Sequence, residues 1–273
     1  MMNRNEIVAH IEETKSLLCV GLDTDLDKIP THLLSNEDPI FAFNKAIIDA
    51  TAAHCVAYKP NTAFYEAYGL EGWKSFEKTV SYIKENYPKH MVIADAKRGD
   101  IGNTAARYAK AFLDTLNCDA ITVAPYMGKD SVQPFSGRKG KWVIVLGLTS
   151  NPGADDIQKL ELSNGLAVSQ SVMDSVASWI PNDELMFVVG ATRPDELAKI
   201  RSRYPETFFL VPGVGAQGGS AAEVVEAGCV KGIYGLLINA SRGVIYASSG
   251  DDFAEAAGRA AEKLKMEMAG AFA

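Results

Sequence analysis

The sequence predicts a (β/α)8 barrel, and three observations lead to this fold class. Short apolar or β-branched runs recur eight times, helical patterns lie between them, and the chain has 273 residues. Several runs are continuous rather than alternating, as is typical of parallel strands covered on both faces. A barrel of this kind needs about 250 residues. We therefore expect a single barrel domain over residues 1–273, with a doubly wound sheet as the alternative.

The elements follow from the periodicity of the apolar residues. The predicted strands lie at residues 17–23, 56–61, 91–97, 120–125, 142–148, 185–192, 208–214 and 235–242. The predicted helices carry apolar residues near a period of 3.6 and lie at residues 40–53, 72–87, 102–116, 166–179, 194–204, 221–227 and 253–268. Residues 151–165, after the fifth strand, form a loop-like insertion.

Composition excludes several classes of protein. The chain is 47% hydrophobic and 22% charged, which favours a large folded core over disorder. Its formal net charge of −7 creates no general attraction for nucleic acid or acidic membranes. The four cysteines are far apart, and no apolar run approaches the roughly 18 residues of a membrane span. We expect a cytoplasmic protein without disulfides, nucleic-acid partner or membrane partner.

The densest group of charges ends the third predicted strand. The period of two residues places the side chains of Asp95 and Lys97 on one face of that strand. Gly99 then turns the chain, and we expect the turn to bring Asp100 back near Lys97. An ammonium group between two carboxylates stays protonated and can donate a proton. The alternative interpretation is a solvated turn with exposed ion pairs.

Other predicted strands also end in polar residues. In a barrel, the carboxyl ends of the strands converge on one mouth, where active sites lie. Asp23, Lys59, Asn61, Ser150 and Arg242 all occupy such ends. Each has an ordinary alternative as a turn, cap or surface residue.

A glycine-rich segment follows the seventh predicted strand. Residues 213–218 match the dinucleotide pattern G-x-G-x-x-G, but residues 237–239 lack the acid that a ribose diol would need. A phosphate loop fits better, because glycines let backbone N–H groups approach an anion closely. Arg242 supplies a countercharge, and Gln217 a further donor. A flexible loop beside a surface arginine is the alternative.

Together these motifs resemble the orotidine 5'-phosphate decarboxylase family, in particular its longer bacterial branch. The resemblance rests on residues 95–104, 59–61, 189–192 and 212–219. It implies decarboxylation of orotidine 5'-monophosphate to uridine 5'-monophosphate in pyrimidine biosynthesis, without a metal or other cofactor. It also implies a homodimer with shared active sites.

The resemblance assigns roles residue by residue. Lys97 would protonate pyrimidine C6, with Asp95 beside the departing carboxylate and Asp100 and Lys59 completing the charged network. The resemblance also implies that Asp23 and Lys59 contact the ribose and that Ser150 contacts the pyrimidine. The residues that it implies around the phosphate loop are Pro212, Gln217, Gly218, Arg242 and Gly243. Asp100, Ile101 and Thr104 would reach the neighbouring subunit's site.

Three other functions compete with this one. Magnesium-dependent sugar-phosphate decarboxylases and aldolases resemble the chain in Asp-x-Lys-x-x-Asp, but they carry a metal-binding glutamate where this chain has Lys59. A lysine there repels a divalent cation. A Schiff-base aldolase needs a lysine of lowered pKa, whereas flanking acids raise it. A nucleotide-binding module without activity would need the phosphate loop but not the acids and lysines.

Overall fold

The computed structural model describes residues 2–191, 193–214 and 219–273. Among these residues, eight parallel strands pair in chain order, and the last pairs with the first to close a barrel. The strands are β1 Leu18–Leu22, β2 Ala57–Pro60, β3 Met91–Arg98, β4 Ala120–Val123, β5 Trp142–Leu148, β6 Leu185–Val189, β7 Phe208–Pro212 and β8 Leu236–Ala240. This topology confirms the predicted (β/α)8 barrel.

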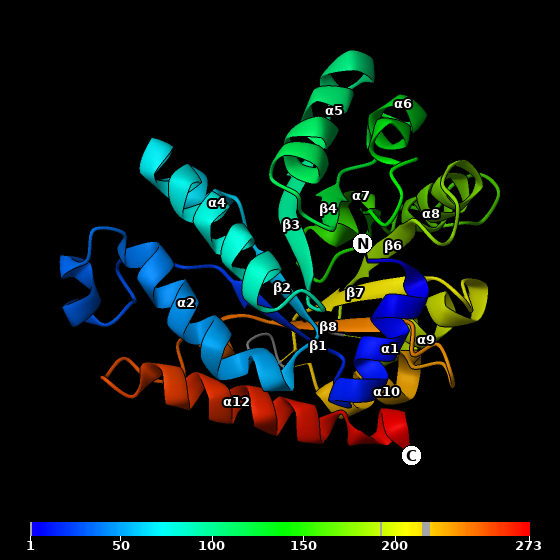
Figure 1. Cartoon of the computed structure of the whole chain (residues 1–273). Coiled ribbons are helices and arrows are strands. Elements are labelled where there is room, and N and C mark those ends of the chain that lie inside the picture. The colour runs from blue at the N-terminus through cyan, green and yellow to red at the C-terminus, as the bar shows by residue number, and fades with distance from the viewer. Residues whose placement is uncertain (1, 192, 215–218) are drawn as a thin grey trace.

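The helices surround the strands, as Figure 1 shows. The α-helices are α1 Arg4–Thr14, α2 Pro39–Thr51, α3 Ala63–Glu66, α4 Gly69–Asn86, α5 Gly102–Ala109, α6 Lys129–Val132, α7 Ala154–Ile157, α8 Val168–Trp179, α9 Pro194–Arg203, α10 Ala221–Gly228, α11 Arg242–Ile245 and α12 Phe253–Glu267. Short helical segments are η1 Thr31–Ser35, η2 Ala52–His54, η3 Lys110–Thr115, η4 Gln133–Phe135 and η5 Ala269–Phe272.

Burial on both faces explains why the strand sequences are continuous apolar runs. Every residue of β1, β4, β6 and β8 is buried. One side of each strand packs inside the barrel and the other packs against the helices, so neither side needs polar residues. The polar exceptions lie at the carboxyl ends of the strands, and the barrel therefore positions them around one mouth.

Helix α1, which the sequence analysis did not predict, covers the opposite end of the barrel. The Arg4 guanidinium donates hydrogen bonds to the carbonyl oxygens of Glu206 and Asn182, which precede β7 and β6. The indole of Trp142, the first residue of β5, donates to the Met2 carbonyl at 2.6 Å. These contacts tie the amino-terminal segment to the starts of three strands and leave the mouth open.

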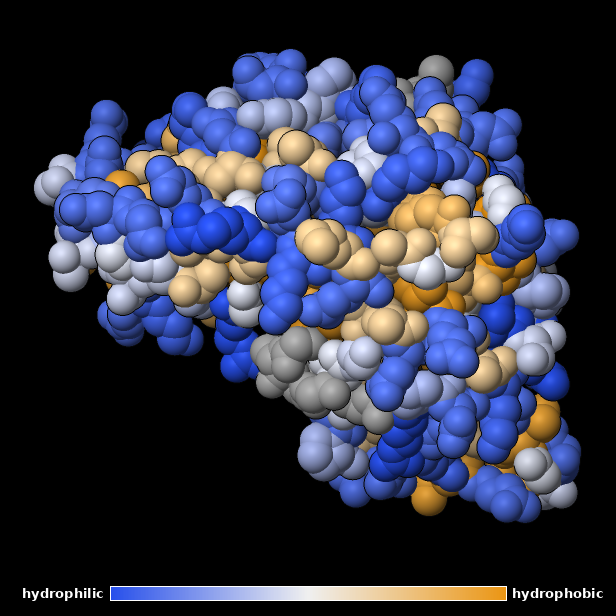
Figure 2. Space-filling model, turned by 90° about the horizontal axis from the view of Figure 1, so that it is seen from below, coloured by the Kyte–Doolittle hydropathy of each residue, from blue (hydrophilic) through white to orange (hydrophobic). Residues whose placement is uncertain are grey.

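The surface is mainly hydrophilic on the face shown in Figure 2, with apolar groups between the charged ones. In the part of the chain that the structure describes, no helix is both long and apolar enough to cross a membrane. The insertion at residues 151–165 contains the short helix α7, and Ser169 N donates to the Gln158 carbonyl. The insertion thus packs against the start of α8 rather than extending as a free loop.

Candidate active site

The carboxyl end of β3 departs from regular strand geometry at Lys97. The register between β3 and β4 shifts between Ala94 and Arg98, and Lys97 has a φ of +43°. This left-handed conformation costs roughly 1–2 kcal/mol for a residue with a side chain. The Lys97 backbone N–H donates to Thr122 Oγ1 on β4 at 2.8 Å, which holds the conformation in place. Backbone strain of this kind is typical of functional sites.

The Asp95 carboxylate lies between two ammonium groups. Its Oδ1 atom accepts hydrogen bonds from Lys97 Nζ at 2.7 Å and from Thr122 Oγ1 at 2.9 Å. Its Oδ2 atom accepts one from Lys59 Nζ at 2.8 Å. Lys59 Nζ also lies 3.9 Å from Asp23 Oδ1. The structure therefore brings four predicted site residues, from β2, β3 and the position directly after β1, into one alternating network of acids and lysines.

Burial makes this network strongly coupled. Burial alone would raise the pKa of Asp95, but the charges of Lys59 and Lys97 outweigh it and hold that pKa well below its usual range. Burial would likewise lower the pKa of Lys59, but Asp95 and Asp23 outweigh it and raise that pKa. Asp95 therefore stays anionic and Lys59 stays cationic. A raised pKa is the opposite of what a Schiff-base lysine needs.

The two lysines differ in accessibility. The Lys59 side chain is 5% exposed, whereas the Lys97 side chain is 50% exposed. Lys59 is consequently a fixed buried charge, and Lys97 presents its ammonium group to whatever enters the mouth.

A cavity of about 210 Å³ lies against these groups. Lys59, Asp95, Lys97 and Thr122 form its charged side, and Ser150 and Pro212 also line it. Its remaining lining comes from Leu146, Thr149, Asn151, Val188 and Leu210. A cavity lined by charged, polar and apolar side chains suits a flat ring that carries an anionic substituent.

The end of β5 is fixed by the insertion. Gln158 accepts a hydrogen bond from the Thr149 backbone N–H at 2.8 Å and donates one to Thr149 Oγ1 at 2.8 Å. Gly190, at the end of β6, passes so close that an added Cβ would lie 2.8 Å from Ser150 Cβ. Ser150 is therefore held from both sides at the edge of the cavity.

The predicted phosphate residues are only partly described. Arg242 and Gly243 begin α11 at the end of β8, exposed at the mouth, and Arg242 pairs with no acid among the described residues. Val214 forms a parallel bridge with Gly219. The predictions for Gln217 and Gly218 lie outside the described residues.

The expected position of Asp100 is wrong within the chain. Asp100 makes no ion pair with Lys97 here, and its Oδ1 instead accepts a hydrogen bond from the Ile101 N–H at 2.7 Å. The Asp100 carboxylate is therefore paired with the backbone of the next residue, just before α5. Ile101 is 51% exposed, and Thr104 is also exposed. None of these three residues lines the cavity.

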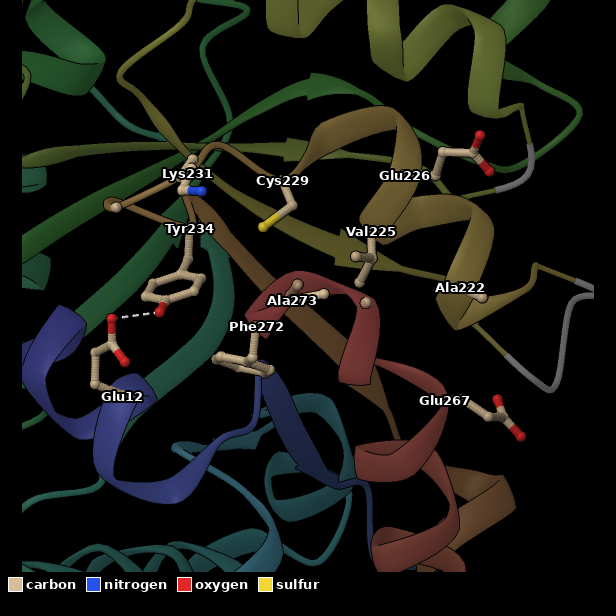
Figure 3. Close-up of a pocket in the computed structure, with 13 residues that line it drawn as sticks. Glu12, Ala222, Val225, Glu226, Cys229, Lys231, Tyr234, Glu267, Phe272 and Ala273 are labelled. Atoms are coloured by element: carbon tan, nitrogen blue, oxygen red, sulfur yellow. Dashed lines mark hydrogen bonds between the residues drawn. The ribbon is translucent and has the colours of Figure 1, made fainter.

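A larger hollow lies elsewhere. A groove of about 700 Å³ is formed by α1, α10, the segment before β8 and the carboxyl-terminal residues. Figure 3 shows the Tyr234 hydroxyl directed at Glu12, while Glu226 and Glu267 point outward. It contains none of the predicted site residues, and it lies toward the end of the barrel that α1 covers. Size alone thus misidentifies the site.

Sequence reasoning missed Thr122 and Gln158. Ile121 on β4 pairs with Ala94 on β3, and Thr122 and Asp95 are the next residues of these two strands. The position of Thr122 beside Asp95 therefore depends on strand pairing. The signal that could have identified Thr122 is a polar residue at an inward-facing position of the strand next to the acid and lysine cluster. Gln158 lies in the insertion and gave no periodic signal.

Fold and site together define a class of protein: a (β/α)8-barrel enzyme whose reactive groups are an alternating network of carboxylates and ammonium groups at the mouth. Comparison with known proteins identifies the particular family. A family model described as "Orotidine 5'-phosphate decarboxylase / HUMPS family" matches residues 16–258. The chain belongs to this family.

Its relatives are similar over their whole length. The chain is 55% identical over 267 residues to orotidine 5'-phosphate decarboxylase of Phocaeicola vulgatus, covering 98% of both chains. It is 56% identical to the protein of the same name from Flavobacterium johnsoniae, covering 98% of this chain and 97% of the relative. The solved OMP decarboxylase of Leishmania donovani superposes with a TM-score of 0.82 at 36% identity, covering 100% of both chains. These relatives confirm the predicted resemblance.

Proposed function

We propose that this chain decarboxylates orotidine 5'-monophosphate to uridine 5'-monophosphate and carbon dioxide, with Lys97 as the proton donor. The family and its full-length relatives support the reaction. One observation carries the residue assignment: Asp95 is held between Lys59 and Lys97, and only Lys97 is accessible.

The reaction needs a cation placed where a carbanion forms. The bond between C6 and the carboxylate carbon breaks, its electron pair stays on C6, and carbon dioxide leaves. The Lys97 ammonium group stabilises that electron pair and then transfers a proton to C6. Lys97 regains a proton from solvent before the next turnover. A preorganised charge of this kind is worth far more in a dry site than in water.

Asp95 has two tasks in this mechanism. It orients Lys97 through the 2.7 Å hydrogen bond, and its negative charge lines the cavity, where the proposed reaction places the substrate carboxylate beside it. Repulsion between the two anions is relieved as carbon dioxide departs. Interactions that improve toward the transition state raise the rate of the chemical step. Lys59 keeps the buried Asp95 charge in place.

The other predicted residues bind the rest of the nucleotide. Ser150 lies at the edge of the cavity, where it reads the pyrimidine. Asp23 and Lys59 hold ribose hydroxyls, and Arg242 neutralises the phosphate together with donors at Gly243, Gln217 and Gly218. Pro212 lines the cavity beside these groups.

We also propose a homodimer in which Asp100, Ile101 and Thr104 complete the neighbouring subunit's site. The exposure of Ile101 and Thr104 supports this role, and Asp100 forms no ion pair with Lys97 of its own chain. Mixing tests it. Lys97→Ala and Asp100→Ala are each expected to be inactive alone. In a mixed dimer, one of the two sites combines an intact Lys97 with an intact Asp100 from the other subunit. About half of the dimers are mixed after the two variants are refolded together, so about a quarter of wild-type activity returns. Mixtures that stay inactive contradict shared sites.

The decisive test of the reaction is spectroscopic. Loss of ultraviolet absorbance from orotidine 5'-monophosphate is followed with and without a chelator. The expected result is full turnover in both, since Lys97 supplies the charge. Chelator-sensitive turnover of a sugar phosphate would instead support the magnesium-dependent alternative. Binding of uridine 5'-monophosphate without turnover would reduce the chain to a binding module.

A further inference from the structure

Arg98 follows Lys97 directly, but it is bound within the protein rather than presented to the mouth. Its side chain is 20% exposed, against 50% for that of Lys97. Arg98 Nη1 donates a hydrogen bond to the carbonyl oxygen of Ala96 at 3.1 Å. Arg98 Nη2 donates another to a carboxylate oxygen of Glu66. The first of these bonds closes a ring of backbone and side chain around Lys97.

The Arg98 guanidinium also joins β3 to the segments on either side of it in the chain. Glu66 is the last residue of α3, which follows β2. Tyr108 belongs to α5 and Phe112 to η3, which both follow β3, and the guanidinium lies 5.4 Å from the centre of each ring. A cation within about 6 Å of an aromatic ring centre is attracted to the ring. One side chain thus anchors the end of β3 to α3 and to α5.

The backbone around Lys97 is fixed at three successive residues. Lys97 itself has a φ of +43°, and its N–H donates to Thr122 Oγ1. The carbonyl oxygen of Arg98 accepts a hydrogen bond from the Ala124 N–H at 2.8 Å, and that of Ala96 accepts from the Arg98 guanidinium. An unfavourable left-handed conformation persists only where the surrounding structure fixes it. The Arg98 side chain supplies part of that restraint.

We propose that Arg98 is a positioning residue, which keeps Lys97 in the conformation that places its ammonium group beside Asp95. Arg98 does not line the cavity, so it acts through Lys97. The planar guanidinium binds a carbonyl and a carboxylate at once while its face lies over aromatic rings, and a lysine cannot do this. The inference rests on the proposed function, because that function makes Lys97 the proton donor.

The kinetic test replaces Arg98 by methionine, which keeps an unbranched stem against the rings and removes both hydrogen bonds. We expect kcat for orotidine 5'-monophosphate to fall roughly ten- to a hundredfold, because small displacements of a reacting group are costly. The dissociation constant of uridine 5'-monophosphate should change less than about threefold, since the loss of one or two ordinary contacts is the most that binding could feel. Arg98→Lys should lose nearly as much kcat as Arg98→Met, because it keeps the charge without the fork.

Glu66 provides a second, milder pair of variants. Glu66→Gln keeps an oxygen that accepts from Arg98 and should retain kcat within about threefold, whereas Glu66→Ala should lose more. Adding Glu66→Ala to Arg98→Met should lower kcat no further, because Glu66 acts through Arg98. Where Arg98→Met does not fold, this pair decides: equal kcat in Glu66→Gln and Glu66→Ala overturns the proposal.

Arg138→Met is the matched control. Arg138 is 25% exposed and has the same kinds of partner, since it donates to Asp114 at 3.1 Å and to the carbonyl oxygen of Pro134 at 2.9 Å. Its loss should lower the melting temperature and leave kcat unchanged. A lower melting temperature with unchanged kcat in Arg98→Met limits Arg98 to a structural role and overturns the proposal. Equal losses of kcat in Arg98→Met and Arg138→Met overturn it as well.

Crystal structures of the wild type and Arg98→Met give a readout that does not depend on the reaction. In the variant we expect Lys97 Nζ to lie outside hydrogen-bond range of Asp95. A contact that is unchanged in the variant overturns the proposal, whether or not the protein decarboxylates orotidine 5'-monophosphate. A wild type without turnover overturns the proposed function, and the two structures still show whether Arg98 positions Lys97.

Discussion

Lys97 Nζ lies 2.7 Å from Asp95 Oδ1, although only one residue separates them and Lys97 has a φ of +43°. The break in register after Ala94 allows this arrangement, because it frees the end of β3 from the regular ladder. The strand thus places a buried acid and an accessible ammonium group side by side. Preorganising the pair in this way spares the reaction the cost of orienting charges at each turnover.

Replacing Lys97 by alanine removes the proposed proton donor. We expect turnover of orotidine 5'-monophosphate to fall by at least about a thousandfold, given what positioned acids and charges contribute. Binding of uridine 5'-monophosphate stays measurable by calorimetry, because Ser150 and the phosphate contacts remain. Near-native turnover in this variant would refute the assignment of Lys97.

Thr122→Val tests whether the neighbouring strand positions the donor. The hydroxyl donates to Asp95 and accepts from the Lys97 N–H, so valine keeps the shape and removes both contacts. We expect kcat to fall roughly ten- to a hundredfold, with a smaller change in KM, because small misplacements of reacting groups are costly. Thr51→Val is the control, since this buried threonine bonds Ile47 and Tyr58 instead. A loss of thermal stability with unchanged kcat in Thr122→Val would limit the residue to a structural role.

The strands were predictable from the sequence because a strand that is buried on both faces appears in the sequence as a short continuous apolar run. Residues 142–148 match β5 at both ends, and the other predicted strands differ from the structure by a few residues at their ends. The contact between Asp95 and Lys97 was also predicted, but the structure forms it through the left-handed backbone at Lys97 rather than through the regular alternation on which the prediction depended. Helix α1 was not predicted, because its polar and charged residues mask its few buried positions.

The direction of a turn was not predictable. Spacing alone suggested that Asp100 returns to Lys97, but the carboxylate is satisfied locally by the Ile101 N–H. The positions of Thr122 and Gln158 depend on strand register and on how an insertion packs, and neither is encoded in local periodicity. Residues that act through pairing with a distant segment therefore need the structure.

Arg242→Ala tests the phosphate contact. Hydrogen bonds to charged groups contribute about 1.5–3 kcal/mol, so kcat/KM for orotidine 5'-monophosphate is expected to fall roughly ten- to a hundredfold. Turnover of unphosphorylated orotidine, which lacks the anion, should change little. Arg259→Ala, at an exposed arginine of α12 that pairs with Asp252, should affect neither substrate. Equal losses for both substrates in Arg242→Ala would argue against a phosphate contact.

Gln158→Ala tests whether the insertion supports the base-binding edge of the site. The variant loses both hydrogen bonds to Thr149, which precedes Ser150. We expect KM for the nucleotide to rise about three- to tenfold, as for the loss of one or two ordinary hydrogen bonds, with kcat little changed. Asp156→Ala, at an exposed position of the same insertion, is the matched control. If both variants behave alike in steady-state kinetics, Gln158 does not position Ser150.

The buried histidine of α1 makes stability depend on pH. His10 packs edge-on against His90, with ring centroids 4.7 Å apart, and its Nε2 atom is buried without a partner among the described residues. Burial is the main cause that lowers the pKa of His10 to about 4. The charges of His90 and Lys89 add to this effect, and Glu13 opposes it. His10 is therefore neutral in the folded protein at neutral pH.

The sign of the effect follows from proton binding. Between pH 6.5, the ordinary value for histidine, and about 4, the unfolded chain carries a proton on His10 that the folded protein does not. The free energy of unfolding therefore falls as the pH is lowered through this range, by up to about 3 kcal/mol from this residue. Urea unfolding of wild type and His10→Phe at pH 7.5, 6, 5 and 4.5 measures it. The stability of the wild type should fall relative to that of His10→Phe as the pH falls, and parallel curves would show that His10 titrates alike in both states.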